Sequence, residues 1–67
     1  MRVTFLDILR LLQGNKGTVV ELRDMGRVVA TAVMPEFSEV DSLDRTVVAL
    51  EVEILEDNSL KYILEAK

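Results

Sequence analysis

The sequence predicts an α+β fold in which an N-terminal helix packs on a four-stranded antiparallel sheet made of two β-hairpins. All 67 residues are expected to belong to this single domain, 1–67. Apolar residues recur with a helical period between positions 4 and 14, but they alternate with other residues from 18 to 34 and from 46 to 66. Turn-forming stretches with glycine or asparagine separate these segments, which favours two hairpins after one helix.

The segment TFLDILRLLQG, residues 4–14, is typical of a short amphipathic helix. Thr4 is a favourable N-cap residue, and Asp7 stands three positions later, where the second member of a capping box belongs. Gly14 follows the last periodic apolar residue, so we expect it to adopt the left-handed conformation that ends many helices. The apolar side chains span about 220° of the helix circumference, more than contact with one sheet requires.

The segment TVVELRDMGRVVATAVM is expected to form the first hairpin. If its apolar residues are to share one face of the sheet, the numbers of opposed residues must have an even sum. A three-residue loop of 24–26 satisfies this condition and places Gly26 where a left-handed residue is needed. The sequence therefore predicts that Leu22 pairs with Val28 and Val20 with Ala30.

The connector PEFSEVDSLDR, residues 35–45, begins with Pro35, which should end the preceding strand. Phe37, Val40 and Leu43 recur at every third position, so we expect a short helical turn to place them beneath the sheet. The intervening carboxylates should then face solvent: Glu36, Glu39, Asp41 and Asp44.

The last segment, TVVALEVEILEDNSLKYILEAK, predicts the second hairpin. A loop of 56–58 gives Asn58 a left-handed conformation that asparagine tolerates, and it sets Glu53 opposite Lys61. A loop of 57–59 would instead set Glu51 opposite Glu65, and like charges repel. The predicted pairs are therefore Ile54 with Leu60, Val52 with Tyr62 and Leu50 with Leu64, with the even-numbered residues facing the helix.

The composition argues against an enzyme. The chain contains neither cysteine nor histidine, so disulfides and the usual zinc, iron and copper ligands are excluded. The serines lie in predicted loops without a basic partner nearby in sequence, and the acidic connector lacks the pattern of a calcium loop. We expect no catalytic residues, no metal site and no cofactor.

Net charge is −4 and is unevenly distributed. Residues 1–34 carry five basic and three acidic side chains, whereas residues 35–67 carry three basic and nine acidic ones. Such an acidic chain is a poor ligand for nucleic acid and a better one for a basic protein surface. No apolar run approaches the roughly 20 residues of a membrane helix, and no signal peptide is evident, so we expect a cytoplasmic protein without membrane contact.

Two charged groups are candidate contact sites. The acidic connector residues Glu36, Glu39, Asp41 and Asp44 are expected to form either a solvated loop or a surface for a basic partner. Arg23 and Arg27 should face each other beside the first hairpin loop, where like charges repel. They either spread into solvent or hold an anionic group from a partner or ligand.

The outer face of the sheet is unusually apolar for a surface exposed to water. Together with the wide apolar arc of the helix, this predicts a homodimer, because monomers seldom expose a large contiguous apolar patch. The alternative is a monomer whose outer residues reflect strand propensity alone. The expected dimer interface comprises Leu6, Leu11, Val29, Val33, Val47, Ala49 and Ile63.

The order FLDILRLLQGN, VVELRD, a second strand and LDRTVVALEVE resembles small uncharacterised proteins encoded by phages and prophages of Firmicutes. The resemblance covers most of the chain and lies in its layout. It implies a non-enzymatic, dimeric inhibitor of a bacterial anti-phage defence system, similar to anti-CRISPR proteins or the Hachiman anti-defence protein. Such a protein would bind a host defence protein or complex inside the bacterial cytoplasm. The alternatives are a small oligomeric sponge for a nucleotide signal and a virion or regulatory accessory protein.

Overall fold

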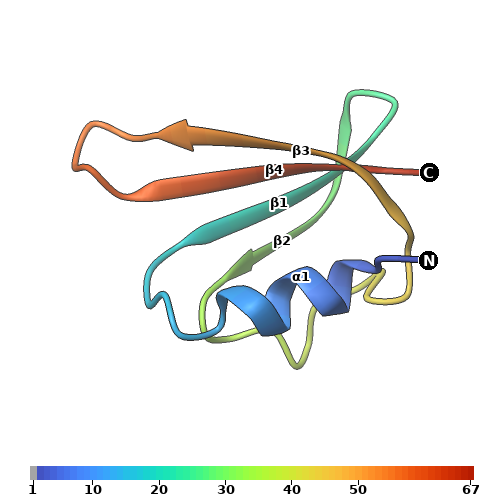
Figure 1. Cartoon of the computed structure of the whole chain (residues 1–67), viewed down its shortest axis with the longest axis horizontal. Coiled ribbons are helices and arrows are strands. Elements are labelled where there is room, and N and C mark those ends of the chain that lie inside the picture. The colour runs from blue at the N-terminus through green and yellow to red at the C-terminus, as the bar shows by residue number, and fades with distance from the viewer. Residues whose placement is uncertain (1) are drawn as a thin grey trace.

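The computed structural model describes residues 2–67 and contains one helix and a four-stranded sheet (Figure 1). Helix α1 covers Phe5–Leu12 and is followed by strands β1, Val19–Asp24, and β2, Arg27–Val33. After the connector come β3, Val47–Ile54, and β4, Leu60–Ala66. The predicted α+β class and the predicted order of elements are confirmed.

Helix α1 begins with the predicted capping box. The Thr4 hydroxyl accepts a hydrogen bond from the Asp7 amide at 3.2 Å, and the Asp7 carboxylate accepts one from the Thr4 amide at 3.0 Å. The expectation for Gly14 is wrong, because the helix ends at Leu12 and the left-handed glycine is Gly17, with φ of 88°. The chain reverses through successive turns, so the glycine is needed nearer to the start of β1.

The first hairpin has a register that differs from the prediction. Its loop has two residues, Met25 and Gly26, both with positive φ, as in the type I′ turns that suit hairpins. A β-bulge after Leu22 then restores the even pairing, so that Leu22 lies opposite Ala30 rather than Val28. The bulge does what a longer loop was expected to do, and Val28 is left exposed.

The second hairpin has the predicted register. Leu50, Val52 and Ile54 of β3 lie opposite Leu64, Tyr62 and Leu60 of β4, and Glu53 lies opposite Lys61. Asn58 has a φ of 67°, as expected for the left-handed position of the loop. The cross-strand charge pair and the turn residues were sufficient to predict this register, because no β-bulge interrupts the pairing between Ala49 and the loop.

The sheet is mixed rather than purely antiparallel, which corrects the prediction. Its strand order is β2-β1-β4-β3, and the two central strands β1 and β4 run parallel (Figure 1). Each hairpin thus contributes its more deeply buried strand to the centre and its other strand to an edge. The parallel contact opposes Val20 with Tyr62 and Leu22 with Leu64.

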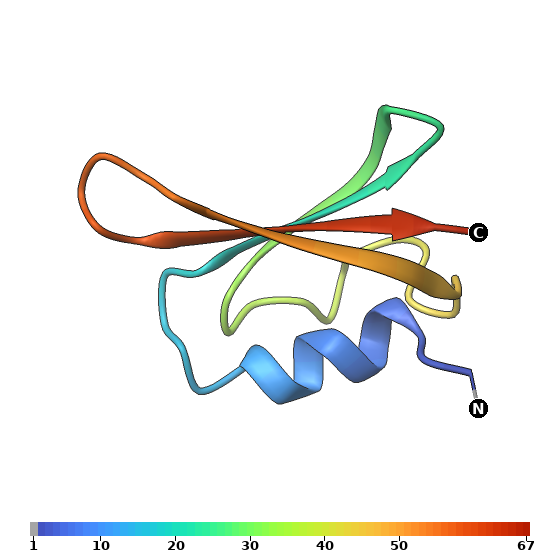
Figure 2. The same cartoon turned by 45° about the horizontal axis from the view of Figure 1, so that its top comes forward.

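The hydrophobic core lies between the sheet and a layer formed by α1 and the connector, which lie on the same side of the sheet (Figure 2). Phe37, Val40 and Leu43 pack against this core as predicted, but hydrogen-bonded turns rather than a short helix place them there. The fully buried centre consists of Phe5, Leu9, Val20, Leu22, Met34 and Leu64.

Strand β3 does not contribute its apolar face to the core as predicted. Leu50, Val52 and Ile54 point to the same side of the sheet as α1, yet they are 56%, 48% and 71% exposed. A second β-bulge near the start of β3 turns Val47 toward the core and leaves Val48 exposed, the reverse of the predicted arrangement. The helical layer covers β2, β1 and β4 but stops short of β3.

Leu64 and Leu50 lie opposite each other, so they provide a test of this partial coverage. Leu64→Ala should lower the free energy of unfolding by about 2–5 kcal/mol, because it opens a cavity in the buried core. Leu50→Ala removes the same atoms from an exposed position and should change stability by less than about 1 kcal/mol. Urea denaturation followed by circular dichroism measures both values. Equal losses would contradict the described coverage.

Candidate functional site

The acidic connector residues are exposed, and the backbone that carries them is fixed to the helix. The amide of Leu6 donates to the Leu43 carbonyl, and the amide of Phe5 donates to the Arg45 carbonyl, both at 2.9 Å. The half-buried Phe37, Val40 and Leu43 hold the same segment against the core. The connector is therefore a defined surface, and its carboxylates are held at the edge of the helical layer.

Glu36 and Glu39 border an open depression of about 320 Å³, lined also by Phe37, Ser38 and Val40. Its lining is part apolar and part polar, and two of its five residues are acidic. Asp41 and Asp44 lie further along the connector and do not line it. The structure thus brings together two of the four predicted acidic residues.

The carboxylates of the connector have no cationic side chain within ion-pair distance among residues 2–67. The guanidinium of Arg2 reaches this region, but it donates to the main-chain carbonyl of Asp44 and to the Thr46 hydroxyl. The charges on the four acidic side chains are consequently available to a basic partner. No group of three or more acidic side chains in the described chain is arranged to hold a metal ion.

Arg23 and Arg27 do not lie opposite each other, as the predicted register required. The two-residue loop places Arg23 opposite Val28 and Arg27 opposite Asp24. Arg23 is also engaged, because its Nε donates to Glu21 Oε1 at 2.5 Å. The expected pair depended on the hairpin register and is lost with it.

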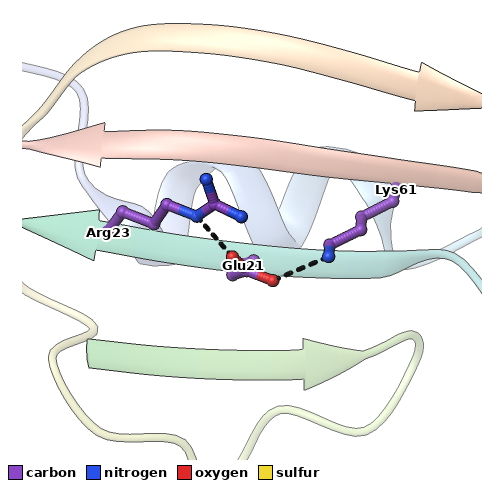
Figure 3. A network of polar contacts seen from close by, with 3 residues as sticks. All are labelled: Glu21, Arg23 and Lys61. Carbon is purple, nitrogen blue, oxygen red and sulfur yellow. Dashed lines mark hydrogen bonds and ion pairs between the residues drawn. The ribbon is translucent and has the colours of Figure 1, made fainter. Parts of the chain in front are cut away.

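Glu21 is the centre of a polar network that the sequence did not indicate as a site. It lies on the face of the sheet opposite to α1, and its carboxylate is contacted by Arg23 on β1 and Lys61 on β4 (Figure 3). The Lys61 Nζ to Glu21 Oε2 distance is 2.9 Å, and Glu21 is only 7% exposed. The spacing of Glu21 and Arg23 on one strand face was visible in the sequence, but Lys61 enters through the parallel pairing.

This network lowers the pKa of Glu21 below its ordinary value of 4.5. The hydrogen bond from Lys61 is the main cause, and the bond from Arg23 adds to it, while desolvation of the carboxyl group acts in the opposite direction. One carboxylate shared by two cations is a structural cross-link between β1 and β4.

The predicted dimer residues are dispersed over several surfaces. Val29 and Val33 are exposed on β2, and Ala49 is exposed on β3 at the opposite edge of the sheet. Leu11 on α1 is 78% exposed, whereas Leu6 is half-buried. Ile63 is buried at 8% exposure and Val47 packs toward the core, so neither offers a free apolar surface.

No protein-family model, curated protein or solved structure matches the chain. Within residues 2–67, α1 is too short to cross a membrane, and no other helix is present to do so.

Acid should destabilise the chain partly through Glu21. Because the pKa of Glu21 is lower in the folded chain, its network stabilises the fold above about pH 4.5, and this contribution is lost as the pH falls through the lowered value. Glu21→Gln should therefore lose less stability than the unmodified chain between about pH 6 and pH 3. Urea denaturation across this range measures the difference.

Asp7 and Asp57 also have lowered pKa values, caused by hydrogen bonds from Thr4 and Ser59, so Glu21→Gln should retain part of the acid sensitivity. The control Glu56→Gln changes an exposed carboxylate and leaves the Glu21 network intact. It should preserve the pH dependence of the unmodified chain. An identical pH dependence in the Glu21 variant would contradict the stabilising role of the network.

Proposed function

We propose that the chain is a non-enzymatic interaction protein that binds a basic surface of a protein target through its acidic connector. Following the resemblance to small phage and prophage proteins, we propose that the target belongs to a bacterial anti-phage defence system. The protein would then act as an inhibitor in the cytoplasm of the bacterial host. No cofactor or catalytic step is part of this proposal.

The depression beside Glu36 and Glu39 is the observation that carries the proposal. A lysine or arginine side chain could lay its apolar stem on Phe37 and Val40 while its charge reaches the two carboxylates. Because the connector backbone is already fixed to α1, little ordering entropy would oppose the contact. Asp41 and Asp44 would extend the negative potential and accelerate association with a basic surface.

The nucleotide-sponge alternative has weaker support. It needs basic and aromatic groups around one pocket, and the candidates are Arg23, Arg27, Arg45 and Tyr62. The register separates Arg23 from Arg27, and two of these arginines are already in ion pairs, Arg23 with Glu21 and Arg45 with Asp24. The virion or regulatory accessory alternative shares the protein-binding mode and differs in its target.

A plaque assay tests the anti-defence proposal. The chain is expressed in strains that each carry one defence system, and these are challenged with sensitive phage. We expect plaques to be restored in at least one strain. In that strain, Glu36→Gln/Glu39→Gln should reduce rescue by about tenfold or more, because two charge-assisted contacts are lost.

The matched control is Glu56→Gln/Glu65→Gln, which also removes two negative charges but leaves the connector unchanged. It should rescue plaques as well as the unmodified chain does. Equal loss in both variants would indicate a dependence on net charge rather than on the connector. Absence of rescue across a broad panel of defence systems would overturn the anti-defence proposal.

Self-association is the second part of the proposal and is supported by the exposed valines of β2. Val29 and Val33 remain on the outer face expected for the dimer, and Val28 adds a further exposed apolar side chain beside them. The Glu21 network crosses the centre of that face, so we place the contact at the β2 edge rather than over the whole sheet.

Sedimentation equilibrium at several protein concentrations tests this contact. The unmodified chain should sediment as a dimer, and Val33→Lys should shift it toward the monomer, because the substitution places a charge in an apolar interface. Ile54→Lys changes an even more exposed residue on β3 and should leave the dimer intact. A monomer at all concentrations would refute self-association.

A further inference from the structure

The free edge of β3 is the most exposed apolar feature of the sheet. Among residues 2–67, β3 pairs along its length only with β4. Its first residues are covered, since Thr46 forms a bridge with Thr4 and the Val47 amide donates to the Val3 carbonyl at 2.8 Å. Beyond the bulge the edge is open from residue 50 to 54. Figure 2 shows that the β3–β4 hairpin extends past the end of α1.

In β3, every second residue directs its amide and carbonyl groups away from β4, toward the open edge. The Leu55 amide donates to the Ser59 carbonyl at 2.9 Å, which places Leu55 among the residues that bond to β4. In an antiparallel ladder these residues alternate with residues whose amide and carbonyl point away. Leu50, Val52 and Ile54 therefore present their N–H and C=O groups at the open edge.

The same three residues carry the uncovered apolar side chains. Leu50, Val52 and Ile54 are about half to three-quarters exposed on the α1 side of the sheet. An added strand would satisfy their backbone groups and cover their side chains together. Its own apolar side chains would then need to lie on the α1 side, beside these residues and past the end of the helical layer.

The opposite side of β3 is acidic. Glu51 and Glu53 are exposed there, and neither has a cationic partner among the ion pairs of the described residues. Lys61, which lies opposite Glu53, is engaged by Glu21 on the next strand. A strand added beside β3 would place its intervening side chains against two unneutralised carboxylates.

We propose that this edge accepts an extended segment of a partner protein as a fifth, antiparallel strand, in which apolar residues alternate with lysine or arginine. The matching segment has five residues, apolar opposite Leu50, Val52 and Ile54 and basic opposite Glu51 and Glu53. The inference rests on the proposed protein-binding function but assigns the contact to a surface separate from the connector. The interface is small, so the segment binds weakly by itself and adds to the contact made elsewhere.

A second copy of this chain fits the edge poorly. If two β3 strands pair antiparallel with Val52 opposite Val52, all the apolar residues lie opposite one another. The same register sets Glu51 of each copy opposite Glu53 of the other. Pairing about Glu51 opposes the two copies of that residue. Like charges directly opposite each other destabilise a sheet, and charged residues on an edge strand are a known protection against self-pairing.

Nuclear magnetic resonance of the purified chain tests the proposal with capped nine-residue peptides. One peptide alternates valine with lysine, and its counterpart alternates valine with glutamate. The lysine peptide should shift the amide signals of Leu50, Val52 and Ile54 and protect them from hydrogen exchange. The glutamate peptide should bind at least about tenfold more weakly than the lysine peptide, because two favourable charge pairs become repulsive.

Backbone methylation separates strand addition from general charge attraction. In an antiparallel fifth strand the valine amides face β3, so N-methylation of the valines should abolish binding, whereas N-methylation of the lysines should be tolerated. Glu51→Gln/Glu53→Gln should remove the preference for lysine over glutamate. The control Glu36→Gln/Glu39→Gln alters the connector and should retain it.

Equal affinity for the two peptides or insensitivity to valine N-methylation would overturn the proposal. So would protection of the β3 amides that grows with protein concentration without peptide. The last outcome would identify a second copy as the occupant. The titration contains no defence system, so its result is independent of the plaque assay. Plaque rescue with no peptide binding would refute the fifth strand and leave the connector proposal standing.

Discussion

The parallel pairing of β1 with β4 is the contact on which the rest of the structure depends. It joins two hairpins that are each local in sequence, and it makes Leu22 and Leu64 direct neighbours at the centre of the core. The same pairing brings Lys61 to Glu21, so the cross-link on the outer face reinforces the core contact on the inner face. It also determines which strands become edges, namely β2 and β3.

Burial explains why β4, rather than β3, lies in the centre. Strand β4 places Leu64 and Ala66 in the core and buries Ile63 on the outer face, between the half-buried Lys61 and Glu65. Strand β3 carries Glu51 and Glu53 on its outer face, where burial between two strands would desolvate both carboxylates. An edge position leaves those carboxylates in water, whereas the central position of β4 buries Ile63, Leu64 and Ala66.

Local chemistry could be predicted from the sequence, whereas contacts between hairpins could not. The capping box of Thr4 and Asp7, the left-handed Asn58 and the phase of Phe37, Val40 and Leu43 depend on residues close together in the chain. The order of the strands depends on which hairpin faces meet, and alternation alone is the same for parallel and antiparallel neighbours. Neither bulge was predicted, for a related reason. Each shifts the register by one residue, and the alternating pattern of the sequence does not reveal such a shift. The acidic connector could therefore be placed at the surface, while the Arg23–Arg27 pair and the Glu21 network could not.

The width of the sheet relative to one short helix accounts for the surface left at β3. Strands in a sheet lie about 4.8 Å apart and a helix with its side chains is about 10 Å wide, so one helix covers roughly two strands. The connector covers more through Phe37, Val40 and Leu43, yet Leu50, Val52 and Ile54 remain exposed. Among residues 2–67, no further helix or strand covers them. The glutamates on the other side of β3 then determine which strand the edge can accept, because they oppose pairing with a second copy and favour a basic strand.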